Sequence, residues 1–229
     1  MNAATSAKSV RGLAELRVGG LERLSMCDWP GELAATIFCQ GCPWDCPYCH
    51  NPHLLPVAGQ HEIAWREVVD FLKSRRGLLD GVVFSGGEPT LQSALPQAIA
   101  EVRDLGFRIG LHTAGPYPGR LAAVLPLLDW VGFDIKAPFA EYRGITQVPG
   151  SGDKALVSFR HLIASGVPFQ ARTTVHPDLL DEAALERLLA DLHALGVHEH
   201  KIQVFRPQGC VDDTLLRSAA APLRPAPSP

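Results

Sequence analysis

The sequence predicts an α/β protein, a partial and open β/α barrel of about six units. Two observations predict the parallel sheet: short β-rich runs alternate with amphipathic stretches over most of the chain, and the amphipathic stretches keep their apolar residues at helical spacing. A third predicts that the barrel stays open, because a closed barrel has eight units and typically about 250 residues, whereas about six units are visible here.

The expected strands are runs rich in Val, Ile, Phe and Thr. In chain order they cover residues 32–39, 81–85, 107–113, 130–136, 168–175 and 200–205. Helices are expected between them, where apolar residues recur at helical spacing and Gly follows the last turn. These helices fall within residues 62–76, 95–106, 154–166 and 181–196.

The two ends of the chain lack this periodicity. Residues 1–17 are expected to form a flexible N-terminus, and residues 216–229, which include the run LRPAPSP, a disordered tail. Residues 18–31 are expected to form an extended lead-in and a turn before the first core strand. A single barrel domain is therefore expected over residues 18–215.

Composition indicates the setting of the protein. The N-terminus has no apolar signal region, and no stretch approaches the ~18 consecutive apolar residues of a membrane span, so a cytoplasmic protein is expected. A net charge of −3 and a pI near 6.3 provide no basic surface for nucleic acid. In a reducing compartment, clustered Cys residues favour metal binding or catalysis over structural disulfides.

Four Cys residues follow the first expected core strand, in CQGCPWDCPYCH at residues 39–50. Other chemistry-bearing stretches also stand at the ends of strands: SGGEP at 85–89, HTAG at 112–115, DIK at 134–136, and Arg172. Because the carboxyl ends of parallel strands meet at one edge of a sheet, these residues are expected to form a single site.

The Cys spacing distinguishes between kinds of metal site. All four residues give C-x2-C-x3-C-x2-C, which differs from the bacterial ferredoxin order and is cramped for zinc. Cys42, Cys46 and Cys49 alone give C-x3-C-x2-C, and three thiolates on a 4Fe-4S cluster leave one iron free for a small molecule. A thioredoxin-type motif is a weaker option, since it should open a helix. Cys39 belongs to the end of the strand and is expected to be a bystander.

GCPWDCPYCHNP together with FSGGEPTLQ resembles the radical S-adenosylmethionine (SAM) superfamily, and the ending CHNP is similar to the glycyl-radical-enzyme activases. The lead-in LERLSMCDWPGELAATIFCQGC most resembles the anaerobic ribonucleoside-triphosphate reductase activating proteins. The resemblance runs from about residue 18 to about residue 215. It implies a barrel of the radical SAM type.

The resemblance also implies cofactors and a reaction. Cys42, Cys46 and Cys49 would hold one 4Fe-4S cluster, and SAM would bind its fourth iron. One electron then breaks a sulfur–carbon bond of SAM and yields a 5′-deoxyadenosyl radical. The implied partner is a glycyl radical enzyme, in particular anaerobic ribonucleoside-triphosphate reductase. The electron would come from an external donor such as flavodoxin or ferredoxin, because the chain has too few Cys residues for further clusters.

The same resemblance assigns SAM contacts nearest to the cluster. Gly86 and Gly87 would let the backbone approach the ligand's ammonium group. Glu88 would supply an anionic acceptor beside it, and Tyr48 would lie against the adenine. Because these glycines and the Cys ligands lie on different strands, Gly87→Val is expected to weaken SAM binding while the cluster still forms.

More distant SAM contacts are implied on the later strands. Lys136, in a D-x-K pattern with Asp134, would meet the SAM carboxylate, and Arg172 would grip it through two hydrogen bonds. An ordinary strand-end ion pair is the structural alternative for Asp134 and Lys136. Thr113 stands where related activases carry an Asp-Thr pair, but His112 precedes it here, which departs from the pattern of a cation site.

The remaining His and Cys residues are not expected to bind iron. His50 and His53 are expected to shape the loop, and His176 to lie on the rim of the barrel. Cys27 and Cys210 are expected to be small buried residues or incidental thiols.

Two alternatives to an activase remain at this point. A small-molecule radical SAM enzyme, such as a 7-carboxy-7-deazaguanine synthase, has a similarly trimmed barrel, but its Cys motif usually continues into Cys-Asp-Thr, unlike Cys49-His50-Asn51. A zinc-binding interaction module is disfavoured by GGEP and by the β/α alternation.

Overall fold

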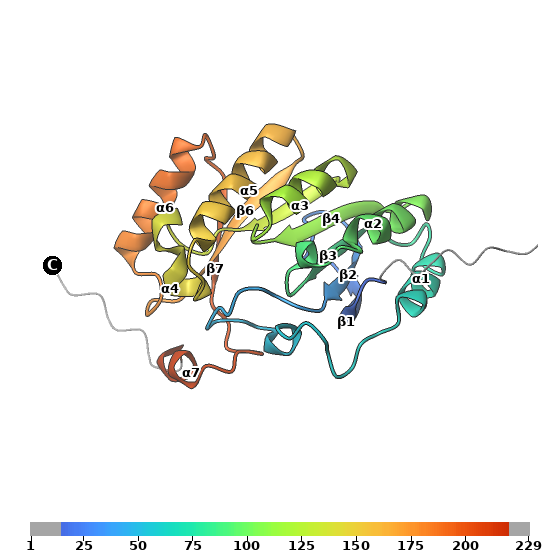
Figure 1. Ribbon diagram of the computed structural model, residues 1–229, viewed down its shortest axis with the longest axis horizontal. Coiled ribbons are helices and arrows are strands. Elements are labelled where there is room, and N and C mark those ends of the chain that lie inside the picture. The colour runs from blue at the N-terminus through green and yellow to red at the C-terminus, as the bar shows by residue number, and fades with distance from the viewer. Residues whose placement is uncertain (1–14, 220–229) are drawn as a thin grey trace, which may run out of the picture.

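A seven-stranded sheet organises residues 15–219, the part of the chain that the computed structural model describes (Figure 1). The strands are β1 Val18–Ser25, β2 Ala34–Cys39, β3 Gly81–Gly86, β4 Arg108–Thr113, β5 Trp130–Asp134, β6 Phe169–Val175 and β7 His200–Val204. Their order in the sheet is their order in the chain, and β2 to β7 are parallel. The six expected strands and the open β/α architecture are thereby confirmed.

Helices connect the parallel strands and pack along one side of the sheet (Figure 1). They are α1 Trp65–Lys73, α2 Leu95–Asp104, α3 Pro118–Val124, α4 Tyr142–Thr146, α5 Ser151–Ser165 and α6 Glu182–Ala194. A further helix, α7 Asp213–Ala219, follows β7 and lies apart from this layer (Figure 1). The expected helices correspond to α1, α2, α5 and α6. The other three are too short to show a helical period in a sequence window. Within residues 15–219, none of these helices combines the length and the apolar character that crossing a membrane requires.

The two faces of the sheet carry different side chains, because successive residues of a strand point to opposite sides. Ile37, Phe84 and Leu111 are fully buried in the main core, to which the helices contribute. On the other face, Trp29 stacks on Trp130 with ring centroids 5.7 Å apart. These apolar layers make the sheet a rigid base for the loops at its edges.

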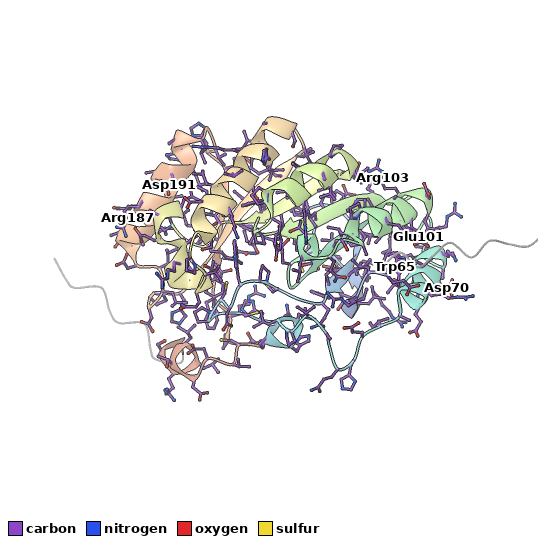
Figure 2. The ribbon with its side chains drawn as sticks, viewed as in Figure 1. Trp65, Asp70, Glu101, Arg103, Arg187 and Asp191 are labelled. Atoms are coloured by element: carbon purple, nitrogen blue, oxygen red, sulfur yellow. The ribbon has the colours of Figure 1, made fainter. Side chains whose placement is uncertain are left out.

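Polar contacts fix the helix layer in addition to apolar packing. Trp65 Nε1 of α1 donates to Glu101 Oε2 of α2 at 2.7 Å, and Figure 2 labels both residues. Asp191 of α6, also labelled in Figure 2, accepts a hydrogen bond of 3.0 Å from the Phe139 amide. Phe139 begins the short 3-10 turn η4, Phe139–Glu141, that follows β5. The loop after β5 is therefore held by the helix that follows β6.

The lead-in to the first core strand is itself part of the sheet. Residues 18–31 were expected to be extended, but β1 pairs antiparallel with β2, with Leu21 opposite Ile37. The expectation that residues 1–17 are flexible is wrong for Leu16 and Arg17. Leu16 is 3% exposed, and the Arg17 backbone exchanges two 2.8 Å hydrogen bonds with the Gln92 side chain. Residues 1–14 lie outside the described part of the chain.

The disordered tail was expected to begin at residue 216, which is too early. Helix α7 runs across the proposed boundary at residue 215 and continues to Ala219. Leu215 is 3% exposed and belongs to the main core, which holds this helix in place. The domain therefore extends to at least Ala219, and residues 220–229 lie outside the described residues.

Candidate active site

The expected site residues gather where the parallel strands end. The loop after β2 carries the Cys residues, β3 ends at Gly86, β4 ends at Thr113, and Asp134 of β5 pairs in register with Arg172 of β6. Because β2 to β6 are parallel, their carboxyl ends meet at one edge of the sheet. The sequence expectation of a single convergent site is consistent with this arrangement.

The cluster loop, residues 40–50, is closed by hydrogen bonds to the short 3-10 turn η1, Pro52–Leu54, and the residue after it. The Gly41 amide donates to Leu54 O at 2.7 Å, and the Cys42 amide donates to Leu55 O at 3.1 Å. Gly41 has a φ of +95°, a conformation that other residues adopt only with strain. The first Cys of the three-residue motif is thus placed by backbone contacts.

The three candidate iron ligands are free thiols of intermediate exposure. Burial raises the pKa of Cys42 to about 12 and that of Cys46 to about 11, and it also raises the pKa of Cys49. The Cys49 amide donates to Cys46 O at 3.0 Å, which forms a tight turn between these two ligands. Iron binds thiolates, so cluster assembly must remove protons from these thiols.

Cys39 lies in a different environment. Its side chain is fully buried in the main core at the end of β2, and burial raises its pKa above the ordinary thiol value. Throughout residues 15–219, no three or more His, Cys, Asp or Glu residues are arranged to hold a single metal ion.

Gly87 and Glu88, which follow the end of β3, contact the backbone at the start of the cluster loop. The Gly87 amide donates to Cys39 O, and the Glu88 amide donates to Gly41 O, both at 2.9 Å. A Cβ atom at position 87 would lie 2.4 Å from Gly41 O and 3.0 Å from Leu54 O. The two loops are therefore one packed unit, so a side chain at position 87 is expected to disturb the cluster loop as well as SAM binding.

Gly87→Ala is expected to lower the free energy of unfolding by about 1–3 kcal/mol, because the new methyl group must push backbone atoms apart. Reconstituted protein should also hold less iron. Gly119→Ala is the matched control, since a Cβ atom there meets nothing within 4 Å. Urea denaturation and iron analysis of both variants check this, and equal behaviour of the two would contradict the packing argument.

Glu88 joins two loops rather than facing an open cavity. Its side chain is 2% exposed and accepts hydrogen bonds from the Thr113 hydroxyl at 2.8 and 3.0 Å and from the Ala114 amide at 3.1 Å. Thr90 donates through its amide and its hydroxyl. Burial raises the pKa of Glu88 despite these donors. Glu88 and Thr113 thus tie the β3 loop to the β4 loop, and their direct contact with SAM stays a prediction.

Asp134, Lys136 and Arg172 form a compact charged triad. Lys136 Nζ lies 3.2 Å from Asp134 Oδ2, and Arg172 Nε bonds Asp134 Oδ1. Burial alone would raise the pKa of Asp134, but the Arg172 and Lys136 charges outweigh it and hold that pKa well below its ordinary value. Burial would lower the pKa of Lys136, and the Asp134 charge raises it well above the usual range instead. The triad carries one net positive charge.

His112 stands beside this triad as a neutral side chain. Burial and the Arg172 charge lower the pKa of His112 to about 4. Its Nε2 lies 2.7 Å from Asp28 O, so Nε2 carries the proton and donates it, while Nδ1 accepts from the Ser85 hydroxyl at 3.1 Å. Arg172 Nη1, 3.2 Å from the protonated Nε2, therefore makes a packing contact with the ring rather than a hydrogen bond.

Tyr48 provides the clearest sign that the site is built for a ligand. The residue is 5% exposed, and its hydroxyl is buried without a hydrogen-bond partner. Lys136 Nζ lies 5.6 Å from the centroid of its ring. A buried hydroxyl without a partner is unfavourable, so a bound molecule that supplies one fits this position. The residues present thus suit a thiolate-bound cluster and a polar ligand beside it.

Sequence reasoning missed the residues that support the cluster loop from outside. The Asp45 amide donates to Thr146 O of α4 at 3.2 Å, and Trp44 packs edge-on against Tyr142 with ring centroids 5.9 Å apart. The Tyr142 hydroxyl accepts from the Lys136 amide at 3.1 Å. These contacts join segments far apart in the chain, and no local pattern indicates them.

The His and Cys residues outside the motif are placed as follows. His176, expected on the rim, is 1% exposed and therefore buried. His50 bonds Arg206 O through Nε2 at 2.9 Å. Cys27 is exposed and Cys210 is buried, and neither adds a thiol to the motif.

Comparison with known proteins identifies relatives of this fold and sequence. The family model described as the radical SAM superfamily matches residues 36–190. A pyruvate formate-lyase-activating enzyme of Clostridium pasteurianum is 31% identical over 209 residues, which cover 81% of this chain and 85% of that one. A protein of Methanocaldococcus jannaschii, to which the activity of a glycyl-radical enzyme activating enzyme is attributed, is 29% identical over 206 residues, 86% of this chain and 82% of that one.

Solved structures share the fold at much lower identity. The structure of anSMEcpe with bound AdoMet superposes with a TM-score of 0.60 at 16% identity and covers 73% of this chain and 49% of that one. Streptococcus suis SuiB bound to S-adenosylmethionine superposes with a TM-score of 0.57 at 10% identity and covers 73% of this chain and 39% of that one. The chain thus spans less than half the length of these two proteins.

Proposed function

The chain belongs to the radical SAM superfamily, and from this membership we propose that it is an activase that generates a glycyl radical on a partner enzyme. The superfamily uses a 4Fe-4S cluster and SAM. The observation that carries the proposal is the sequence CHNP, which begins at the third cluster thiol, on a chain similar to a pyruvate formate-lyase-activating enzyme over most of both lengths.

Cys42, Cys46 and Cys49 hold the cluster in this proposal, and Cys39 takes no part. When bound and reduced, the cluster and SAM supply the one-electron cleavage that yields methionine and a 5′-deoxyadenosyl radical. Cys39 is fully buried at the end of β2, whereas the three loop thiols have intermediate exposure. One iron therefore remains for SAM.

The charged triad orients SAM. Its two cations share one carboxylate, Asp134, and the net positive charge that remains suits the carboxylate of the methionyl group. Asp134 holds Lys136 and Arg172 in place, while their unused donors are available to the ligand. The Tyr48 hydroxyl, which lacks a protein partner, is the second polar contact that SAM satisfies. The burial of these side chains keeps water from the reacting group.

We further propose that the partner is an anaerobic ribonucleoside-triphosphate reductase. Its support is the lead-in LERLSMCDWPGELAATIFCQGC, which most resembles activating proteins of that reductase. The sheet supports a protein substrate in general, because β7 is its last strand among the described residues and has a neighbour, β6, on one side only. A loop of another protein can approach the strand ends from this open side.

Electrons must reach the cluster from outside the chain. The three Cys residues that are not assigned to the cluster lie apart from one another in sequence and differ in exposure: Cys27, Cys39 and Cys210. They form no second cluster motif, and the proposal therefore includes an external electron donor such as flavodoxin or ferredoxin.

The proposed function is tested with anaerobically reconstituted protein, a strong reductant, SAM and a candidate reductase. The expected result is 5′-deoxyadenosine and an electron paramagnetic resonance signal of a glycyl radical on the reductase. A reductase with Ala in place of its radical-forming Gly is the control and should give no such signal. SAM cleavage without a protein radical on any candidate would favour the small-molecule alternative, and no SAM cleavage at all would refute the cofactor assignment.

A further inference from the structure

A segment from the far end of the chain closes over the cluster loop. We call residues 205–210, which follow β7 and lead to α7, the clasp. Figure 1 shows this segment running beside the loop that follows β2, with α7 next to it and apart from the main helix layer. The contacts between the clasp and the loop join residues that are as much as 163 positions apart in the sequence.

The clasp contacts the turn between the last two iron ligands. The Cys210 thiol donates to Pro47 O at 3.4 Å, and Pro47 lies between Cys46 and Cys49. On the other side of Cys49, His50 Nε2 donates to Arg206 O at 2.9 Å. The clasp therefore contacts the cluster loop on both sides of Cys49: at Pro47, within the turn, and at His50, directly after it.

Close packing accompanies these hydrogen bonds. The His50 ring stacks on Phe205 with centroids 5.9 Å apart and planes inclined by 19°. Gly209 comes so close that a Cβ atom there would lie 2.2 Å from His50 O. Because Gly209 also has a φ of +84°, this position requires glycine both for its conformation and for its contact with the loop.

The clasp is itself anchored in the domain. The Phe205 amide donates to Val175 O of β6 at 3.0 Å, and the buried His176 packs edge-on against the Phe205 ring with centroids 5.0 Å apart. Helix α7 is fixed by Leu215, which is 3% exposed. The clasp is thus anchored at both of its ends, through the buried Phe205 and Cys210.

We propose that the clasp positions Cys46 and Cys49 for iron, so that Phe205 and Gly209 are positioning residues for the cluster. The clasp contacts two residues next to these ligands, Pro47 and His50. Groups that orient the ligands of a metal site set its affinity nearly as strongly as the ligands themselves. A loop that is already ordered loses less conformational freedom when iron binds. The inference rests on the cluster assignment and is independent of the identity of the partner enzyme.

Gly209→Ala tests the proposal against the matched variant Gly196→Ala. Both positions have a positive φ, +84° and +77°, but a Cβ atom at Gly196 meets nothing within 4 Å. The two variants therefore share the cost of the backbone conformation, and they differ in the contact with His50. Reconstituted Gly209→Ala is expected to release iron to a chelator ~10-fold faster than Gly196→Ala, with an altered electron paramagnetic resonance spectrum of the reduced cluster.

Hydrogen exchange of the iron-free protein supplies a readout that needs no cofactor. Amides of residues 44–50 are expected to exchange faster in Gly209→Ala, and those of the distant helix α2 to remain as protected as in the unchanged protein. If Gly209→Ala does not fold, Phe205→Ala replaces it, with Phe205→Leu as the conservative variant that should restore slow iron release. Iron release from Gly209→Ala, or from Phe205→Ala, at the rate of its control would overturn the proposal, whether or not any glycyl radical enzyme is activated.

Discussion

Ser at Cys42, Cys46 or Cys49 is expected to abolish the cluster or its reaction with SAM, whereas Cys39→Ser should retain about four irons per chain and SAM cleavage. The three loop thiols have intermediate exposure, and Cys39 is fully buried in the core. A fourth protein thiolate would also occupy the iron that SAM needs. Iron analysis, visible spectra and 5′-deoxyadenosine formation of the four variants check this result.

The effect of Cys39→Ser on folding must be measured separately from its effect on iron binding. A buried hydroxyl in an apolar core costs about 1–3 kcal/mol when it has no partner, so the thermal midpoint of the iron-free variant should be measured beside its iron content. Cys39→Ala, which adds no polar atom, separates the two effects. A folded Cys39→Ala protein that is poor in iron would show that four thiolates act together and would contradict the three-ligand site.

Asp134→Asn is expected to lower the free energy of unfolding by about 3 kcal/mol, because it leaves two poorly exposed cations without their anion. The side chains of Lys136 and Arg172 are only 16% and 12% exposed. SAM binding should weaken as well, since both cations lose their common anchor. Asp70→Asn is the matched control: Asp70 also pairs with two cations, but its side chain is 56% exposed, so the loss there should stay below about 1 kcal/mol.

A comparison of the unchanged protein with Asp134→Asn also tests how this stabilisation depends on pH. The pKa of Asp134 is lower in the folded protein than in the unfolded chain. Its stabilising contribution is therefore complete above the ordinary Asp pKa of about 4 and is lost as the pH falls from there toward the lowered native value. The stability difference between the unchanged protein and Asp134→Asn should narrow over this acidic range. A difference that stays constant from pH 7 to pH 3 would contradict the charge argument.

Local patterns predicted much of this fold because each parallel strand pairs with the next one in the chain. Alternation of apolar runs was enough to locate β2 to β7 and four of the helices. The pairing of β1 was missed because Gly19 and Gly20 weaken its strand pattern. Helix α7 was missed because seven residues are too few to show a helical period.

The candidate site was predictable to the extent that its residues follow strand ends. The Cys motif, GGE and D-x-K segments could be placed together because parallel strands end at one edge. What each side chain does there depends on neighbours from other segments. The Glu88 carboxylate accepts hydrogen bonds from Thr90, Thr113 and Ala114. No spacing in the sequence indicates that Glu88 and Thr113 face each other.

The position of the clasp has a consequence for how the protein is made. Synthesis proceeds from the amino end, and the sheet order lets each new strand join one that already exists. The iron-binding turn follows the second strand, yet the hydrogen bond of His50 cannot form until Arg206, 156 residues later, has been synthesised. A growing or truncated chain without β7 and the clasp would present all three thiols without the clasp contacts beside the last two. Firm retention of iron is therefore expected only once the clasp has been made, and chains that stop before β7 are expected to release iron faster than the full chain.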